Sequence, residues 1–554
     1  MLITFIFTTV ISIVILGYSY FFKIILLNQK NDVIKNLDFV YGVFFLILIG
    51  IFFNFFLPIE KIKFFIFILG LLFFIIAFIK NKISIDTKIF LCFLFFFSFF
   101  TYWNSNNVDS PVYHIQTIKW IHDYKITFGL AILDWHYALN SVWHIFLSTL
   151  SFQYKNFNTF YVLSFIPISF MLCESFNLKK EFSISNLTIF FSSIFILFFS
   201  LIHPYQNGII FNHLGNPEVD ITGMVFFILA VFNFLKFIEN KKKDYLRLLI
   251  IYSVLCPLIK FSYIGTMLLP VLAIMYHKLD IKILFQKISW ISVLLITLWS
   301  TRHLILSSCF LFPISFTCIK SSWALSNDQV LFYLNQTKSF ARDTRLRAKY
   351  RDFEHTIHSN DWFVPWVKDY LFNDALLKIS FSILTISLAV YLINIFKKYL
   401  KLDVIKLDKL FYYLFILYLV NLYIWFQAPE IRFGWGIHIV FPCIMLSLCI
   451  FNLDILKKIN GNIYNLTIIL LCILLMAKNF EKFDITNLKV EFAKKFDYSQ
   501  IVKHGNYNNI DIFRSKNWQC ADFKDICINK PKKNYYLDNI NNYIFISTSD
   551  RETY

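Results

Sequence analysis

The chain has 554 residues, of which 58% are hydrophobic, and its mean hydropathy is +0.60. This composition excludes a soluble globular protein, because the polar residues are too few to cover so much apolar surface. A formal net charge of +18 would suggest nucleic-acid binding in a soluble chain. Here the lysines lie in short loops beside apolar runs, where they orient spans and attract anionic lipids. We therefore expect an integral membrane protein that contacts membrane lipids and does not bind nucleic acid.

Apolar runs long enough to cross a bilayer, which takes about 17–25 residues, recur along the chain. They lie at residues 2–27, 39–57, 64–79, 89–103, 159–176, 184–202, 219–235, 248–276, 288–306, 376–396, 410–427, 437–453 and 463–478. The run at 248–276 has basic residues at both ends and is interrupted by Pro257 and Lys260, so we read it as two short spans folded as a hairpin. The expected fold class is an all-α polytopic membrane protein with about 14 spans.

Lysine content alternates between the gaps that separate these runs. Gaps such as the one from Lys236 to Lys243 are rich in lysine, whereas every second gap holds little. The positive-inside rule places the lysine-rich gaps in the cytoplasm, so the other gaps and both termini are expected outside. The first run, 2–27, lacks a basic start and a small-residue cleavage site, which favours a retained span over a signal peptide.

The apolar stretch 138–152 is too short for a span and is expected to be interfacial or re-entrant, with a small domain formed by the polar tail. This choice places Asp109 and Asp220 on the same outer side. The expected organisation is N-terminal spans (1–87), a core with outer acidic loops (88–306), an outer basic loop (307–375), C-terminal spans (376–479) and an outer polar tail (480–554). The outer basic loop contains a helix-prone run from Lys338 to Arg351.

Ten cysteines are scattered along the chain, without a CxxC pair or the Cys/His spacing of a zinc site. Most are expected to be small buried hydrophobes. Cys520 and Cys527 differ, because they lie in the tail that the topology places outside, where disulfides persist. They are the candidate disulfide.

The first outer loop of interest holds Asp109, followed by Tyr113, His114 and the amphipathic stretch 115–124. Asp109 precedes Pro111 by two residues, so one interpretation is an aspartate that stabilises a turn through its own side chain. The other is a carboxylate at the membrane surface that takes a proton from an acceptor hydroxyl. The residues alone leave both open.

A second lysine-free loop holds His203 and His213 and ends with Glu218 and Asp220 at the start of a span. An acid at this position is a common helix cap. Two acids and two histidines in one outer loop could instead bind a divalent cation or position an acceptor. The spacing does not specify a metal.

Three basic residues lie in or beside spans, where ionisable groups are costly and therefore informative. They are Lys260, Arg302 and Arg432. Arginine presents a planar fork of donors that matches phosphate oxygens, and lysine presents a point charge. Anchoring at the membrane surface is the alternative. Together they indicate an outer site for a membrane-borne phosphate.

These features resemble the GT-C superfamily of membrane glycosyltransferases, which use polyprenyl-phosphate-linked sugars. The likeness consists of an acid shortly after a span, then a tyrosine and an interfacial helix, and a second outer acid two crossings later. The stretches at 109–114, 260–262, 302–313 and 428–436 are more closely similar to a group of multispanning bacterial proteins encoded among surface-polysaccharide genes. The chain departs from the GT-C pattern because Ser110 follows Asp109 in place of a second acid, which leaves metal binding there in doubt.

The resemblance implies an inverting hexosyltransferase on the outer face of a bacterial inner membrane. Asp109 would be the base or the carboxylate that positions the acceptor, and Glu218 and Asp220 would orient the acceptor or an optional divalent cation. Tyr113, His114, Lys260, Arg302 and Arg432 are the expected substrate-binding residues. A polysaccharide polymerase or ligase, and a flippase or other transporter for lipid-linked oligosaccharides, are the alternatives.

Overall fold

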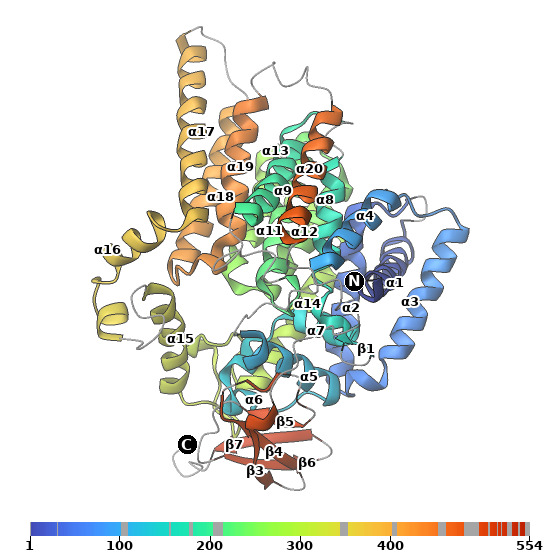
Figure 1. Ribbon diagram of the computed structural model, residues 1–554, viewed down its shortest axis with the longest axis vertical. Helices are drawn as coiled ribbons and strands as arrows, with labels where there is room; N and C mark the ends of the chain where they lie inside the picture. The colour runs from blue at the N-terminus through green and yellow to red at the C-terminus, as the bar shows by residue number, and fades with distance from the viewer. Residues whose placement is uncertain are drawn as a thin grey trace.

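The computed structural model is mostly helical, with strands confined to a short hairpin and to the tail (Figure 1). It describes residues 2–29, 32–100, 109–154, 157–176, 181–202, 214–343, 353–400, 407–451, 461–480, 498–507, 510–517, 519–521, 523, 525–528, 535–540 and 543–548. The two histidines expected near the second acid, His203 and His213, lie outside these residues, as does most of the basic run beyond Asp343.

Long apolar segments form helices because a bilayer offers no partner for backbone N–H and C=O groups. The helices are α1 (Leu2–Tyr20), α2 (Phe39–Asn54), α3 (Lys63–Ile79), α4 (Thr87–Phe100), α5 (Ile115–Asp123), α6 (Leu130–Leu133), α7 (Val142–Thr149), α8 (Phe165–Ser175), α9 (Ile184–Ile202), α11 (Asp220–Asn240), α12 (Lys243–Ile259), α13 (Leu269–His277), α14 (Lys287–Ser307), α15 (Asn327–Arg342), α16 (Phe363–Trp366), α17 (Ala375–Leu400), α18 (Leu407–Phe426), α19 (Trp435–Phe451) and α20 (Gly461–Phe480). The short helices used below are η4 (Ser110–His114), η5 (Trp135–Leu139), η8 (Phe261–Leu268) and η13 (Ile431–Gly434).

Within the described residues, eight helical segments are long and apolar enough to cross a membrane, and five shorter apolar helices accompany them. The chain is therefore a helical membrane protein. The figure of about 14 spans, the orientation in the membrane and the outer location of the termini stay predictions.

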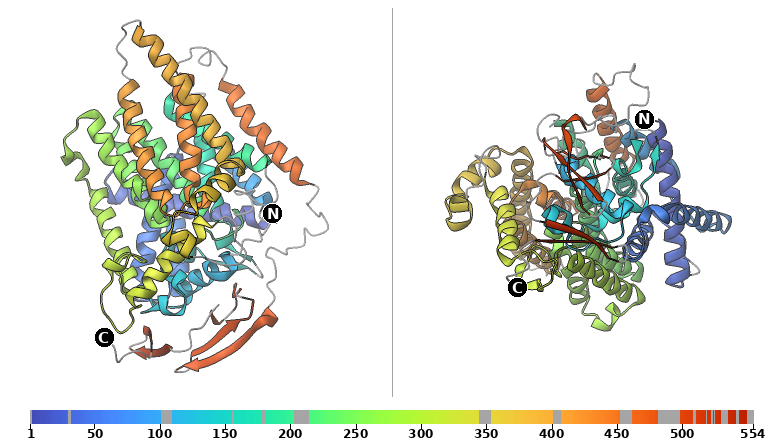
Figure 2. Two further views of the ribbon diagram at one scale, coloured as in Figure 1. Left: turned by 90° about the vertical axis from the view of Figure 1, so that its left-hand side faces the viewer. Right: turned by 90° about the horizontal axis from the view of Figure 1, so that it is seen from below.

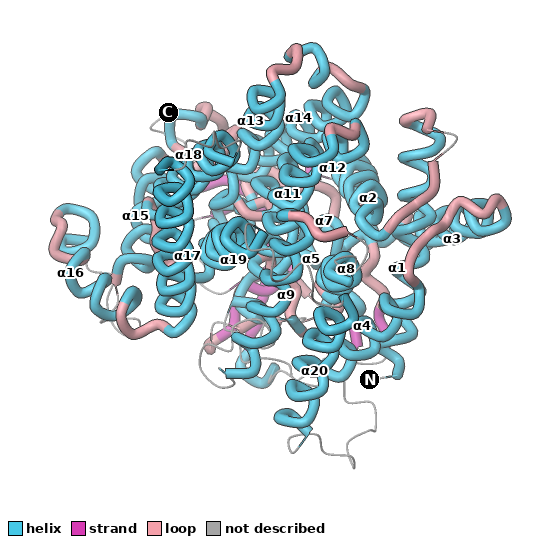
Figure 3. The backbone as a smooth tube through the Cα atoms, turned by 90° about the horizontal axis from the view of Figure 1, so that it is seen from above, coloured by secondary structure: helices cyan, strands magenta, loops and turns pink. Residues whose placement is uncertain are grey.

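Helix α11 forms the centre of the bundle. Its apolar residues continue around the whole helix, and its span is 100% buried by its neighbours. Helices α9, α12 and α19 pack against it, whereas α17 and α18 lie at the edge with spans only 28% buried (Figure 3). The central helix thus has a fixed position, and the first turn of α11 carries Asp220.

One expectation about irregular segments is confirmed, and a second stays a prediction. The run at 248–276 is split at Lys260 into α12 and the pair η8 and α13, which pack against α12. The stretch 138–152 contains the end of η5 and the fully buried helix α7, whose eight residues are too few to span a membrane. Its interfacial or re-entrant placement stays a prediction. Both breaks direct polar residues toward the same region.

The expectation of an all-α fold is wrong for the tail, which forms β-strands. The described strands are β1 (Gln153–Tyr154), β2 (Phe157–Asn158), β3 (Ile501–Tyr507), β4 (Ile510–Ser515), β5 (Ile526–Ile528), β6 (Tyr535–Ile540) and β7 (Tyr543–Thr548). Strands β3, β4 and β5 form a mixed sheet, and β6 and β7 form a hairpin. The hairpin docks on the core where the N–H of Phe128 donates to the carbonyl of Ile544 and the N–H of Ile546 donates to that of Phe128.

The tail strands and α15 lie toward one end of the molecule, and the C-terminal end of α17 lies at the other (Figures 1 and 2). The predicted disulfide Cys520–Cys527 is confirmed, and a second one that was not predicted joins Cys309 to Cys318.

Candidate active site

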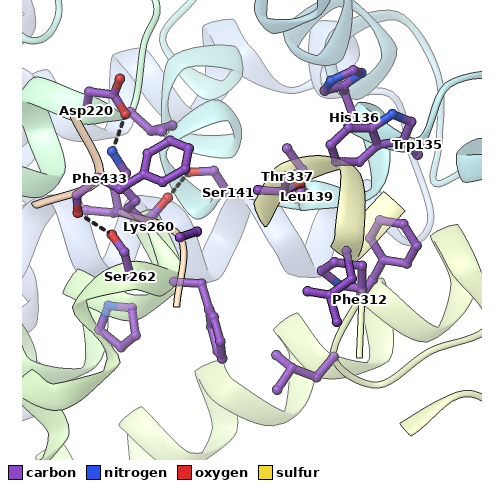
Figure 4. A pocket seen from close by; sticks show the side chains of 18 of the residues that line it. Trp135, His136, Leu139, Ser141, Asp220, Lys260, Ser262, Phe312, Thr337 and Phe433 are labelled. Atoms are coloured by element: carbon purple, nitrogen blue, oxygen red, sulfur yellow. Dashed lines mark hydrogen bonds and ion pairs between the residues drawn. The ribbon is translucent and has the colours of Figure 1, made fainter. Parts of the chain in front are cut away.

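A cavity of about 470 Å³ opens between the helical core and α15 (Figure 4). Its volume lies within the range of about 300–1,000 Å³ that is typical of ligand sites. One part of its wall is charged, and much of the rest is apolar or aromatic. The charged and histidine side chains that line it are Asp109, His114, His136, His144, Asp220, Lys260, His303, Lys338 and Arg432.

Two acids from separate loops meet one arginine in this wall. The Nη1 atom of Arg432 lies 2.8 Å from Oδ2 of Asp109 and 3.8 Å from Oδ2 of Asp220. Asp109 directly precedes η4, Asp220 opens α11, and Arg432 lies in η13. Three segments that are far apart in the sequence thus meet through ion pairs with Arg432.

Lys260 reaches the same cluster because α12 ends at Ile259 and the backbone of Lys260 is extended. Its Nζ donates to Oδ1 of Asp220 at 2.5 Å and to the carbonyl oxygen of Arg432 at 2.8 Å. It also lies 4.8 Å from the ring centre of Phe433. A buried ammonium is costly unless its hydrogen bonds are satisfied, and these contacts fix it beside the second acid.

A third acid holds the guanidinium from its other side. Oε1 of Glu430 lies 3.8 Å from Nε of Arg432, and its Oε2 accepts a hydrogen bond from the hydroxyl of Tyr370. The indole of Trp425 donates to the carbonyl of Glu430. The planar fork of Arg432 is therefore fixed in orientation, as recognition of a phosphate requires.

Tyr113 and His114 line the cavity beside the acids. Burial raises the pKa of Tyr113 well above its usual value, and the nearby carboxylate of Asp109 adds to this effect. Burial lowers the pKa of His114 to about 3, so the imidazole is neutral at pH 7. Its Nδ1 lies 2.9 Å from Nε2 of His144, which is also buried.

Residues 1–441 match a family described as a domain of unknown function, DUF8201. The chain belongs to this family. The matched region includes the whole cavity wall and ends before α20 and the tail. No curated protein and no solved structure matches the chain.

Two of the predicted site residues lie away from the cavity of the DUF8201 domain. Glu218 is buried and accepts a hydrogen bond from the hydroxyl of Ser110. Arg302 is buried and donates to the side-chain oxygen of Asn140. Neither belongs to the cavity wall formed by the described residues, so both are placed to support the wall and not to touch a ligand.

Among the wall residues that were not proposed as site residues from the sequence, three carry polar or aromatic side chains used below. Trp135 and His136 follow Asp134 in η5, and Lys338 comes from α15 of the outer basic loop. Glu430, which contacts Arg432 but does not line the cavity, was also not proposed. Asp134 and His136, two residues apart, carried a usable signal, because a carboxylate at that spacing can orient an imidazole.

The described residues do not favour a metal ion at the acidic cluster, because Lys260 and Arg432 already occupy the facing oxygens of Asp109 and Asp220. A different group in the described part of the chain, Glu60, His122 and Asp123, has suitable ligand atoms near one another. There, Nζ of Lys63 lies 3.0 Å from Nε2 of His122, and an ammonium at that distance opposes a cation.

Proposed function

We propose that this protein is an inverting hexosyltransferase of the bacterial inner membrane. It moves a sugar from a polyprenyl-phosphate-linked donor to a glycan, lipid or protein acceptor on the outer face. The observation that carries the proposal is the convergence of Asp109 and Asp220 with Lys260 and Arg432 at one cavity. A sugar phosphate needs both kinds of group, because the reacting hydroxyl must lose a proton while the departing phosphate gains charge.

The two cations would stabilise the charge that the departing phosphate gains. Lys260 and Arg432 would neutralise the phosphate as the bond to the sugar breaks, and preorganised charge of this kind is usually the largest single contribution to catalysis. Asp109 would act as the base or hold the acceptor, and Asp220 would keep Lys260 in place through the 2.5 Å contact. Tyr113 and His114 would pack against the sugar.

The remaining wall suits the lipid part of such a donor. Leu258, Phe312, Phe340, Ile424 and Phe433 give the cavity a largely apolar lining beside its charged part. An amphipathic ligand places its head group on the ions and its isoprenoid chain on this lining. A water-soluble nucleotide sugar would leave these side chains without a partner.

A polysaccharide polymerase or ligase is the second candidate, and one observation favours it. Helix α15, from the large outer loop, contributes Lys338 and Phe340 to the same cavity. A growing glycan would approach along such a loop. The two candidates differ in product, because a polymerase joins many repeat units whereas the transferase adds one sugar.

The decisive experiment is the Asp109→Asn variant in vesicles supplied with polyprenyl-phosphate-linked sugar. Loss of a positioned acid–base or orienting group costs about 10²–10⁴-fold, so transfer should fall by at least about 10²-fold while the protein stays folded and inserted. The matched control is Asp361→Asn, an exposed acid of the outer basic loop, which should transfer normally. Full activity in Asp109→Asn would remove this residue from the mechanism.

A further inference from the structure

The wall of the cavity opposite Asp220 and Lys260 is built from aromatic rings (Figure 4). The ring of His136 stacks on Tyr113 with centres 4.6 Å apart and on Trp135 with centres 3.8 Å apart. Trp135 in turn stacks on Tyr333 of α15 at 5.2 Å. Flat apolar faces beside polar atoms are the surface on which a sugar ring packs.

Within this stack His136 is oriented by a carboxylate. Oδ1 of Asp134 lies 2.6 Å from Nδ1 of His136 and accepts the backbone N–H of His136 at 3.0 Å. The Asp134 side chain is 12% exposed and that of His136 is 29% exposed. The contact fixes the tautomer with hydrogen on Nδ1, which leaves Nε2 as the nitrogen available to a ligand.

The Asp134–His136 contact alone would be ordinary helix capping, because Asp134 precedes η5. Its place in the cavity gives it a further role. Asp134 does not line the cavity, whereas His136 does, and in the described part of the chain no hydrogen bond to Nε2 of His136 is present. A base, an orienting acid and a cavity are the parts that proton abstraction needs.

Asp109 is less suited to that step, because its Oδ2 is held 2.8 Å from the guanidinium of Arg432. The guanidinium therefore already occupies an oxygen that would have to accept the proton. Tyr113 separates the two groups and contacts both regions: it stacks on His136 and lies close enough to Asp109 for its charge to act on the phenol.

We propose that His136, oriented by Asp134, accepts the proton of the acceptor hydroxyl, and that the acceptor sugar packs against Trp135. This inference rests on the proposed transferase function and assigns the acceptor subsite within it. Asp109 then keeps Arg432 in place for the phosphate. The acceptor is a sugar ring of a glycan, because such a ring offers an apolar face to Trp135 and a hydroxyl to Nε2 of His136.

The step balances without a further reactant. The acceptor oxygen forms a bond to the anomeric carbon of the donor sugar, and its proton moves to Nε2 of His136. The bond from that carbon to the phosphate oxygen breaks, and its electron pair stays on the phosphate beside Lys260 and Arg432. The attack comes from the side opposite to the departing phosphate, so the configuration inverts.

The test compares transfer and donor binding in vesicles for wild type, His136→Gln, Asp134→Asn and the control His358→Gln, an exposed histidine of the outer basic loop. His136→Gln should lower transfer by about 10²–10⁴-fold with donor binding changed less than about twofold. Asp134→Asn should lower transfer less than His136→Gln and should shift the pH profile of transfer. Other charged or titratable side chains of the cavity also contribute to that profile: Asp109, Asp220, His114, Lys260, Lys338, Arg432 and Tyr113. The control should behave as wild type.

A purely structural role of His136 is separated by chemical rescue. Added imidazole should restore part of the transfer in His136→Gly if the ring carries a proton, and should restore none if the ring only packs. Wild-type transfer that survives in His136→Gln, or a His136→Gly variant that imidazole does not rescue, would overturn the subsite alone. Absence of transfer by wild type from any polyprenyl-phosphate donor would overturn the proposed function and the subsite together.

Discussion

Two buried lysine–aspartate pairs occupy very different places in this protein. Nζ of Lys23 lies 2.8 Å from Asp38, and both side chains are at most 5% exposed. Nζ of Lys260 lies 2.5 Å from Asp220, with side chains 9% and 11% exposed. The first pair lines no part of the candidate cavity, whereas the second lies in its wall beside Arg432.

The comparison shows what marks a functional charge in this chain. In the first pair other groups complete the contacts: Lys23 also donates to the carbonyl of Val33 and lies 3.7 Å from Oδ2 of Asp32, and Asp38 accepts the N–H of Lys35. In the second pair an arginine and an open cavity are added. A buried ion pair can be purely structural, but one that lines a cavity beside further charged groups is a candidate site.

The largest effect on folding should come from breaking the Lys23–Asp38 pair. Lys23→Met leaves Asp38 buried without its cation, and removal of one partner from such a pair costs about 3–5 kcal/mol. The yield of folded, inserted protein should fall, while transfer per folded molecule stays near wild type. Thermal unfolding in detergent and the exposed-site control Lys80→Met check this. Loss of transfer in the folded fraction would remove the distinction between the pairs.

Changing Arg432, which lies beside the Lys260–Asp220 pair, should instead lower transfer and leave stability nearly unchanged. Arg432→Lys keeps the charge but loses the fork that spans Asp109 and Asp220. Transfer should fall by about 10²–10³-fold, in line with removal of one preorganised donor, with unfolding changed by less than about 1 kcal/mol. Steady-state transfer at saturating donor measures this. Equal losses of stability and activity would make Arg432 a structural residue.

A smaller effect should follow from the tail, which contacts the acidic loop. The N–H groups of Cys520 and Ala521 both donate to the carbonyl of Pro111, two residues after Asp109. Replacing Cys520 and Cys527 together by serine removes a short disulfide loop, which typically costs about 2 kcal/mol. Hydrogen exchange at 109–123 should rise and transfer should fall about tenfold. The free, exposed Cys92 offers a control as Cys92→Ser, and unchanged exchange would separate the tail from the site.

The sequence predicted the helices because a bilayer permits few alternatives, and Lys260 was found because it interrupts an apolar run. It could not rank the two arginines. Arg302 lies on α14 between Trp299 and His303, which line the cavity, but its own guanidinium contacts Asn140. The orientation of α14 about its axis decides which of these side chains reaches the cavity. That orientation is set by packing against neighbouring helices and cannot be read from the pattern of hydrophobic residues.

The same limit applies to the acids and the tail. Glu218 and Asp220 are two residues apart, yet only Asp220 faces the cavity, because the turn before α11 directs them to different sides. The tail strands are short and broken by polar residues, so their alternation is weak as a signal. The Cys309–Cys318 pair was missed because its geometry depends on the fold of the outer loop.

The smallest effect concerns the neutral histidine beside Asp220. Burial, the main cause, lowers the pKa of His114 to about 3, against about 6.5 in the unfolded chain. Only the unfolded state takes up a proton between these values, so the stabilising contribution is complete above pH 6.5 and is lost as the pH falls toward 3. At pH 5.5 the loss should be about 1.4 kcal/mol. Thermal unfolding at pH 7.5 and 5.5 should show this difference in wild type and less of it in His114→Gln. An equal pH dependence in both would mean that folding does not lower the pKa of His114. At pH 5.5 the Lys260–Asp220 pair would then lie beside a protonated His114, which adds positive charge to that of Lys260 and Arg432.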